Sequence, residues 1–267
     1  MPLAVCATPI GNLDDITLRV LDELRSADLV LCEDTRHTRV LLDRHGVSAR
    51  LLSYHEHNEA RRTEQVLPRL RAGDRVALVS DAGLPGISDP GARLVAGALA
   101  AGIPVTVLPG ASAVDTALVA SGFPADRYQF VGFLPRGARA LATLWEELAG
   151  WPHPVVAFES PQRLAATLRS LADSQPDREL AVCRELTKRF EEVVRGTAAE
   201  LVSRFSEPPK GEITLVLGPG AGGRDDAEVA VEAVAELVSA GTPRRRAADV
   251  VARLTGISRN ELYRRTL

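Results

Sequence analysis

The chain has 267 residues, of which 45% are hydrophobic and 25% charged, and its formal net charge at pH 7 is −3. This composition is typical of an ordinary soluble globular protein, and the length allows two domains or one large one. The negative net charge argues against a protein that coats nucleic acid non-specifically, although it leaves room for a local basic groove.

Strand and helix patterns alternate through the first half of the chain. The expected strands cover residues 3–7, 29–32, 50–53, 76–80 and 105–108. The expected helices cover residues 16–26, 38–45, 59–71, 92–101 and 112–121. Parallel strands joined by crossover helices are the economical arrangement for such an alternation. The sequence therefore predicts an N-terminal α/β domain over residues 1–122 with a mainly parallel sheet.

The pattern changes near residue 123. The expected strands cover residues 128–133, 155–158, 180–184, 192–196 and 212–217, and the expected helices cover 138–150, 162–172 and 198–203. Because no helix pattern separates the third and fourth of these strands, we expect them to form an antiparallel hairpin. A second α/β domain with a mixed sheet is thus predicted over residues 123–217.

The last part of the chain, residues 218–267, is predicted to be a glycine-rich linker (218–225) followed by a small helical tail. The helices are expected over 227–240, 245–254 and 258–266, with Ser258 as N-cap of the third and Glu261 as its capping-box partner. The turn Thr255-Gly-Ile257 resembles that of a helix-turn-helix. Several arginines lie nearby, so the tail either contacts RNA or is a helical cap with a solvated arginine face.

The cysteines and the N-terminus indicate the compartment. Cys6, Cys32 and Cys183 lie in apolar strand patterns without Cys-x-x-Cys spacing, which favours buried, reduced thiols. No apolar run approaches the roughly 20 residues that span a bilayer. Residues 1–6 lack the basic region of a signal peptide. We therefore expect a cytoplasmic protein with no membrane association.

The segment 80–91 is rich in turn-forming residues. Its twelve residues hold three glycines, two prolines and two aspartates, and it joins a strand pattern to a helix pattern. A loop at the carboxyl end of a strand is where open α/β sheets hold ligands. Glycine lets a ligand approach the main chain closely, and proline fixes φ in advance. We expect a ligand site here, with a purely structural turn as the alternative.

The turn after the first strand reads Thr8-Pro-Ile-Gly-Asn-Leu13. It matches neither the Gly-x-Gly-x-x-Gly motif of dinucleotide-binding folds nor the Walker A motif. The common nucleotide-dependent oxidoreductases and kinases are therefore excluded.

Two polar segments follow the second and third strands. Glu33-Asp-Thr-Arg36 either faces the same crevice as the glycine-rich loop or starts a helix, with Asp34 or Thr35 as N-cap. Ser53-Tyr-His-Glu-His-Asn58 contains a His-x-His pair, but no second Cys/His cluster completes a zinc site, so we predict no metal. In the functional interpretation, the side chains of this segment act as acid–base or hydrogen-bonding groups on a polar substrate. Capping of the next helix by Asn58 is the structural one.

Taken together, these motifs closely resemble those of the ribosomal RNA small subunit methyltransferase I family, a branch of the tetrapyrrole-methylase (class III methyltransferase) superfamily. The resemblance runs in order from about residue 3 to residue 217, and the tail's Glu261-Leu-Tyr-Arg264 also matches. Further motifs that carry it are Pro109-Gly-Ala-Ser-Ala113, Gly132-Phe-Leu-Pro-Arg136, Glu159-Ser-Pro161 and Glu185-Leu-Thr-Lys188.

The resemblance implies a tetrapyrrole-methylase-like fold of two α/β domains, with S-adenosyl-L-methionine bound in the cleft between them. It also implies a homodimer that 2′-O-methylates a cytidine in the decoding region of 16S rRNA, acting on the 30S subunit. Two departures concern RNA contact: residues 136–140 are less basic than is usual, and residues 216–219 lack an acid often found there.

The resemblance also implies roles for individual residues. The expected cofactor-binding residues are Pro9, Gly11, Asp81, Ala82, Gly83, Pro85, Gly86, Ala111, Ser112, Phe133 and Leu134. A 2′-hydroxyl is a weak acid and needs a base or a polarising contact, for which the candidates are Glu33, His55, Glu56 and His57. The candidates for RNA phosphates are Arg36, Arg136, Arg163, Arg184 and Lys188.

Two other functions stay open. A tetrapyrrole (porphyrinoid) C-methyltransferase would share the glycine-rich loops and the cleft but would not need arginines along a phosphate backbone. A noncatalytic RNA-binding module would leave the loop 80–91 without a ligand.

Overall fold

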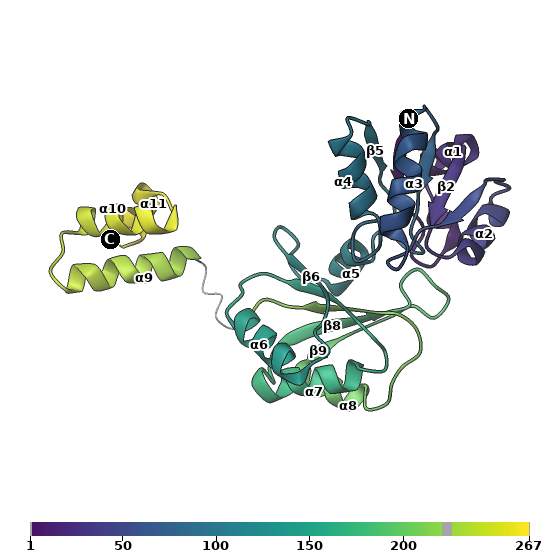
Figure 1. Ribbon diagram of the computed structural model, residues 1–267. Helices are drawn as coiled ribbons and strands as arrows, with labels where there is room; N and C mark the ends of the chain where they lie inside the picture. Colours follow the sequence, from purple (N-terminus) through teal and green to yellow (C-terminus); the bar gives the residue numbers. More distant parts are fainter. Residues whose placement is uncertain (1, 221–225, 267) are drawn as a thin grey trace.

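The computed structural model describes residues 2–220 and 226–266, so most of the predicted linker, residues 221–225, lies outside the described residues. Figure 1 shows two α/β units and a separate group of three helices at the C-terminal end. Within the described ranges, no helix is long and apolar enough to cross a membrane.

The first sheet has five parallel strands in the order β3-β2-β4-β1-β5. The strands are β1 (Leu3–Cys6), β2 (Leu29–Cys32), β3 (Leu51–Ser53), β4 (Val76–Leu78) and β5 (Val105–Leu108). The helical segments between and after them are η1 (Leu13–Asp15), α1 (Leu18–Ser26), α2 (Thr35–Arg44), α3 (Glu59–Arg71), α4 (Ala92–Ala100) and α5 (Ala113–Ser121). This confirms the predicted parallel sheet.

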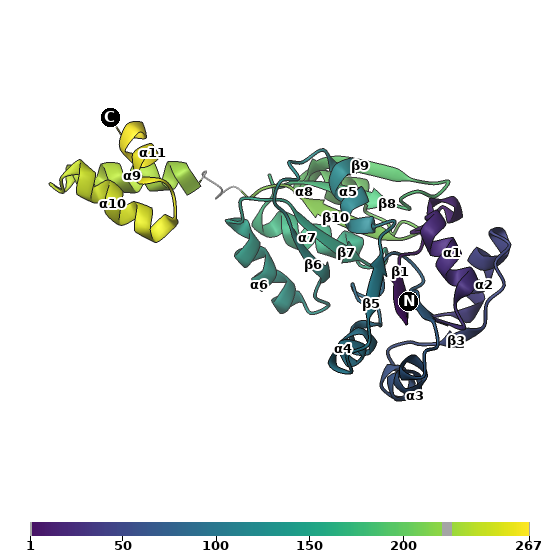
Figure 2. The ribbon, with the colours of Figure 1, turned by 90° about the horizontal axis from the view of Figure 1, so that it is seen from above.

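Helices cover both faces of this sheet, which is why its three central strands β1, β2 and β4 are apolar and buried at every position. Leu3 and Val5 of β1 pack toward α3 and α4, whereas Ala4 and Cys6 of the same strand pack toward α1 and α2. The side chains thus alternate between the faces with the period of two that a strand imposes. Figure 2 shows α3 and α4 on the opposite side of the sheet from α1 and α2.

The second sheet is mixed, with the order β6-β7-β10-β8-β9. Its strands are β6 (Gln129–Phe133), β7 (Val155–Glu159), β8 (Glu179–Arg184), β9 (Glu192–Thr197) and β10 (Ile213–Leu217). β6 and β7 pair in parallel, and the other neighbours are antiparallel. The predicted hairpin is confirmed, because β8 pairs with β9 along its whole length.

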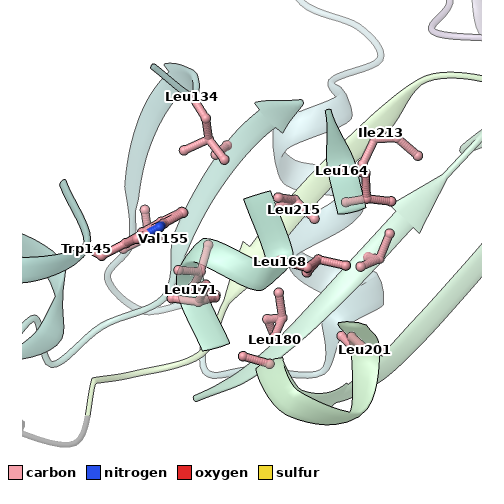
Figure 3. Packing of buried hydrophobic residues seen from close by; sticks show 14 of the residues in the cluster. Leu134, Trp145, Val155, Leu164, Leu168, Leu171, Leu180, Leu201, Ile213 and Leu215 are labelled. Carbon is pink, nitrogen blue, oxygen red and sulfur yellow. The ribbon is translucent and has the colours of Figure 1, made fainter. Parts of the chain in front are cut away.

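One face of the second sheet carries α6 (Ala138–Ala149), α7 (Leu164–Ser174) and α8 (Ala198–Arg204). Figure 3 shows the core between them, where Leu168 and Leu171 of α7 lie beside Leu180 and Leu215 of the sheet. Trp145 is 1% exposed, and its indole N–H donates to Ser170 Oγ at 3.1 Å. Burial of the indole therefore leaves no polar atom of Trp145 unpaired.

The other face of the second sheet is covered by α5, the last helix of the predicted first domain. Val114, Ala117 and Leu118 of α5 form one cluster with Val156 of β7 and Val216 of β10. α5 therefore packs against the second sheet and is not a crossover helix of the first sheet. The boundary at residue 122 stays a prediction, but the change of sheet already occurs before α5.

The C-terminal helices are α9 (Asp226–Ser239), α10 (Arg244–Thr255) and α11 (Arg259–Arg265), and they share a small core around Val234, Val251 and Leu262. The predicted capping box of α11 is wrong. Ser258 is the N-cap residue, but its side chain accepts no capping bond, because the Glu261 N–H donates to the Ser258 backbone oxygen instead.

Helix starts differ from the prediction in two other places. The helix expected over 16–26 begins two residues later, at Leu18, because Thr17 is its N-cap and accepts from the Val20 N–H; the short helix η1 precedes the expected range. The helix expected from residue 38 begins earlier, at Thr35, with Asp34 as N-cap accepting from the Arg36 N–H at 2.8 Å. One of the two predicted N-caps for this helix is thus confirmed.

Candidate functional site

Two loops at the carboxyl ends of neighbouring strands are joined to each other. The loop after β1 and the loop 80–91 after β4 meet in an antiparallel bridge between Thr8 and Gly83. The Thr8 N–H donates to Gly83 O at 2.8 Å, and the Thr8 hydroxyl donates to Ser80 O at 3.0 Å. These bonds fix the shape of both loops at the edge of the sheet where α/β proteins bind ligands.

Gly83 and Gly86 in the loop 80–91 have φ values of +74° and +88°. A Cβ at either position would meet no protein atom closer than 3.7 Å. Glycine is therefore required here by the backbone conformation, while the space beside the main chain stays open for a bound group.

A cleft of about 190 Å³ lies between these loops and the second unit. The first unit lines it with residues of both loops and of α2, and the second unit contributes Lys188 and Glu212. Of the predicted cofactor-binding residues, the lining includes Pro9, Gly11, Asp81 and Ala82. Four of the predicted cofactor-binding residues thus line one cleft, and their role in cofactor binding stays a prediction.

The other residues predicted for the cofactor lie around this cleft in different ways. The backbone oxygen of Ala111 is the protein atom nearest to a Cβ built on Gly83, at 3.9 Å. Ser112 is the N-cap of α5, and Phe133 is exposed at the end of β6. Leu134 is only 2% exposed, and both of its backbone groups are already used, by Phe158 O and by Arg163. The N–H of Leu134 is thus already used, whereas its carbonyl oxygen keeps a second acceptor position.

Carboxylates gather beside the cleft. The Asp34 N–H donates to Asp81 Oδ1 at 3.1 Å, which brings the ends of β2 and β4 together. Burial, and after it the charge of Asp81, raises the pKa of Glu33. Burial, and after it the charge of Glu33, raises the pKa of Asp89 to about 6. Carboxylates with raised pKa values in a cleft can hold a proton near neutral pH, which is typical of functional sites.

The segment 53–58 after β3 lies next to this cluster, because the charge of His55 lowers the pKa of Glu33. His55 Nε2 lies 2.8 Å from Asn58 Nδ2, and the His55 N–H donates to Asn58 Oδ1 at 3.0 Å. Since an amide nitrogen only donates, Nε2 accepts and the proton of the neutral ring is on Nδ1. Nδ1 is buried and has no partner among the described residues. His55 is thus oriented with a donor available for a bound group, while Glu56 and His57 are exposed.

This geometry corrects one structural interpretation. Asn58 occupies the N-cap position of α3, but its side chain makes no capping bond, because it bonds to His55 and Ser53 instead. The amide therefore holds the histidine and does not cap the helix.

The residues predicted for RNA phosphates divide into two groups. Arg36 and Arg136 are exposed, although Arg36 also pairs with Asp34 at 2.7 Å. Arg163, Arg184 and Lys188 are partly buried, with side chains 20–28% exposed, and each pairs with a carboxylate.

Arg163 illustrates the second group. Its Nη2 donates to the backbone oxygens of Leu134 and Pro135 and to Glu159, whose side chain is 1% exposed. This arginine neutralises a buried carboxylate and fixes the end of β6.

Sequence reasoning missed the role of the connection between β8 and β9. Its Glu185 and Thr187 have φ values of +52° and +64°, and the Asn12 N–H donates to the Thr187 hydroxyl at 3.0 Å. A Cβ on Gly11 would lie 2.5 Å from Lys188 Cγ and 2.8 Å from Leu186 O. Gly11 therefore allows the two units to touch, a reason separate from cofactor contact. The sequence held two signals for this connection: the motif Glu185-Leu-Thr-Lys188, and the fact that lysine occurs in this arginine-rich chain at just two positions, one of them Lys188.

No group of three or more histidine, cysteine, aspartate or glutamate side chains in the part of the chain that the structure describes could hold a metal ion. The three cysteines are free and buried, as predicted. Burial raises the pKa of Cys6 and of Cys183 to about 12, which keeps both thiols protonated and unreactive.

The chain matches two family models. Residues 2–202 match the model described as Tetrapyrrole (Corrin/Porphyrin) Methylases, and residues 225–267 match the RsmI C-terminal HTH domain. The match of the tail agrees with the helix-turn-helix likeness predicted from its sequence.

Curated relatives cover nearly all of the chain. Ribosomal RNA small subunit methyltransferase I of Mesorhizobium japonicum is 44% identical over 268 residues, which is 99% of this chain and 91% of that protein. The protein of the same name from Thermotoga maritima is 47% identical over 219 residues, which is 80% of this chain and 97% of that protein.

Solved structures with the same fold are more distant in sequence. The methyltransferase CobJ aligns with a TM-score of 0.63 at 18% identity, covering 82% of this chain and 94% of that one. Uroporphyrin-III C-methyl transferase from Thermus thermophilus, complexed with S-adenyl homocysteine, aligns with a TM-score of 0.57 at 18% identity, covering 81% and 96%. At such identities the likeness shows the fold alone, and it confirms the predicted tetrapyrrole-methylase-like architecture.

Proposed function

Because this chain belongs to the ribosomal RNA small subunit methyltransferase I family, we propose that it transfers a methyl group from S-adenosyl-L-methionine to the ribose 2′-hydroxyl of a cytidine in the decoding region of 16S rRNA. The substrate is the 30S subunit, and the enzyme acts as a cytoplasmic homodimer. The observation that carries the proposal is the cleft between the loops after β1 and β4, in a chain so similar to rRNA methyltransferases.

The residues around the cleft fit this cofactor. Gly83 and Gly86 leave open space beside the main chain. The carboxylates of Asp81 and Glu33 supply negative charge near a ligand that carries a positive sulfonium and an ammonium group. S-adenosylmethionine, when bound, supplies an electrophilic methyl group. The chain contributes the fixed loops that orient it, since positioning is a large part of catalysis of this kind.

Acid–base assistance comes from the group around Glu33, His55 and Asp89. A ribose hydroxyl must lose its proton as the new O–C bond forms, and a side chain with a pKa near neutrality accepts it best. Asp89, with a pKa of about 6, meets this condition, and the pKa of Glu33 is shifted in the same direction by burial and by the charge of Asp81. His55, held by Asn58, presents its Nδ1–H to orient the ribose. Glu56 and His57, both exposed, are the remaining candidates for contact with the nucleotide.

RNA recognition rests on few positive charges. Arg36 and Arg136 are exposed and available to phosphates, whereas the net charge of −3 gives no general attraction for RNA. We therefore assign recognition to the folded shape of the subunit, with backbone contacts from a small number of arginines.

The experiment that tests the function is methylation of purified 30S subunits with a labelled cofactor, followed by mapping of the modified nucleotide and of the position of the methyl group. Naked 16S rRNA and a porphyrinoid serve as competing substrates. Label on a cytidine 2′-oxygen of the 30S subunit supports the proposal. Label on the porphyrinoid alone, or on a base, would replace it with a different activity. Light scattering measures the number of subunits.

A further inference from the structure

The connection between β8 and β9, residues 185–191, forms a rigid arm (the 185–191 arm). Lys188 Nζ pairs with the carboxylates of Glu185 and Glu212 at 3.0 and 2.8 Å, and the Glu185 N–H donates to Glu212 O. The Thr187 N–H donates to the side chain of Glu191. Glu185 and Thr187 have positive φ values, which non-glycine residues keep only where surrounding bonds impose them. The arm is thus fixed in a conformation that its sequence alone would disfavour.

The arm lies at the mouth of the cleft. Leu186 is 7% exposed and is anchored in the core that α5 makes with the second sheet. The next residue, Thr187, bonds to Asn12 of the first unit, and Lys188 lines the cleft itself. Figure 1 shows the connection between β8 and β9 reaching toward the first unit.

The tip of the arm presents an aromatic ring and a cation to solvent. Phe190 is 65% exposed, and the guanidinium carbon of Arg189 lies 5.5 Å from the centroid of its ring. Within the described residues, no carboxylate pairs with Arg189. An exposed ring on a flexible loop would need no explanation. A ring held on a fixed arm, two residues along the chain from Lys188 in the lining of the cleft, is preorganised to bind a flat group.

We propose that Phe190 is the stacking platform for an unpaired nucleobase of the RNA substrate, with Arg189 placed for the adjoining phosphate. This inference rests on the proposed function. A ribose can enter the cleft only when its nucleotide leaves the helical stack, and unstacked bases in RNA are held by aromatic side chains and by arginine. A fixed ring replaces the lost stacking at low entropic cost, whatever the base.

The test compares Phe190→Ala, Phe190→Leu and Phe190→Tyr in single-turnover methylation of 30S subunits by the full-length protein. Leucine keeps apolar volume without a π face, whereas tyrosine keeps the ring. We expect alanine and leucine to lower the rate at subsaturating subunits by about 5- to 100-fold, the range for one stacked base, and tyrosine to stay within about twofold of the wild type. Leu99→Ala on α4, also an exposed apolar side chain, is the control and is expected to be silent.

Two further measurements separate the alternatives. Calorimetry with S-adenosylmethionine should give the same affinity for all variants, and light scattering should give the same mass. Wild-type rates for Phe190→Ala, or equal rates for leucine and tyrosine, would overturn the stacking role. A fall in mass for Phe190→Ala would identify the ring as part of a subunit interface and would also overturn it. If the wild-type protein itself leaves 30S subunits unmethylated, the proposed function fails, and this outcome is visible before any variant is made.

Discussion

Replacement of Gly11 by alanine is expected to push the two α/β units apart where Gly11 packs against the 185–191 arm. The added Cβ would lie 2.5 Å from Lys188 Cγ and 2.8 Å from both Leu186 O and Thr187 Oγ1, and contacts under 3.0 Å force atoms to move. Overpacking of this kind costs about 1–3 kcal/mol. Displacement of Thr187 also breaks its hydrogen bond from Asn12, which adds about 1 kcal/mol.

The free energy of unfolding should therefore fall by about 2–4 kcal/mol, which corresponds to a drop in Tm of roughly 4–16 °C for a chain of this size. Thermal unfolding followed by circular dichroism measures it. Gly150→Ala is the matched control, because its Cβ would meet no atom within 4 Å and its φ of −94° suits alanine. We expect the control to melt within about 2 °C of the wild type.

A double mutant examines the cause. Lys188→Ala removes the Cγ that lies closest to the new methyl group, so Gly11→Ala should cost less in that background than in the wild type. A Gly11→Ala variant that melts like the wild type, or equal costs in both backgrounds, would refute the contact as the source of the effect.

Three further predictions concern the site and its support. His55→Ala and Glu56→Ala should bind S-adenosylmethionine normally and melt within a few degrees of the wild type. Their rate of single-turnover methylation of 30S subunits should fall by about 10²-fold or more, which is the scale of acid–base assistance. Full activity in both variants would return the segment 53–58 to a structural role. Asp89 has a pKa raised to about 6 from 3.8, so the folded state holds its proton more tightly and Asp89 opposes folding increasingly as the pH rises through 4 to 6. The Tm of Asp89→Asn should therefore be higher than that of the wild type at pH 8 and equal to it at pH 3.5. A lower Tm of the variant at pH 8 would contradict the raised pKa. Arg163→Ala leaves the buried Glu159 carboxylate without its cation and should cost about 3–5 kcal/mol in denaturant unfolding; weakened 30S binding with unchanged stability would instead restore this arginine to the RNA surface.

Much of the fold could be predicted because buried strands and helices have recognisable patterns of apolar residues in the sequence. Strands such as Leu29–Cys32, covered on both faces, are continuous apolar runs, and α3 matches its predicted range of 59–71. The errors arose where a polar side chain had two hydrogen-bonding options. Asn58 and Ser258 are both good N-cap residues. Local bonds of Asn58 to His55 and Ser53 and a backbone bond to Ser258 nevertheless replaced the capping bonds.

The candidate site was predictable in its loops and less so in its partners. Turn residues identified the segment 80–91, and the polar segments after β2 and β3 do converge beside it. The sequence could not show which lysine and arginine side chains are available to a ligand, because their partners within the protein lie far away along the chain. Lys188 meets Glu212 across 24 positions, and the Arg163 guanidinium reaches the carbonyl of Leu134 across 29. Asp89 was passed over for the same reason, since its proton affinity comes from burial and from Glu33.

The packing of α5 on the second sheet determines where the molecule can bend. Since this helix moves with the strands it covers, any rotation of one sheet relative to the other must be absorbed between the end of β5 at Leu108 and the start of α5 at Ala113. That short segment contains Ala111, whose carbonyl lies beside Gly83 of the loop 80–91, and Gly110, which sits so close to Ala7 that an added Cβ would be 2.9 Å from it. The segment that must absorb such a rotation therefore lies against the loops after β1 and β4, which line the cleft. A ligand that fixes these loops would also restrict the angle between the two sheets.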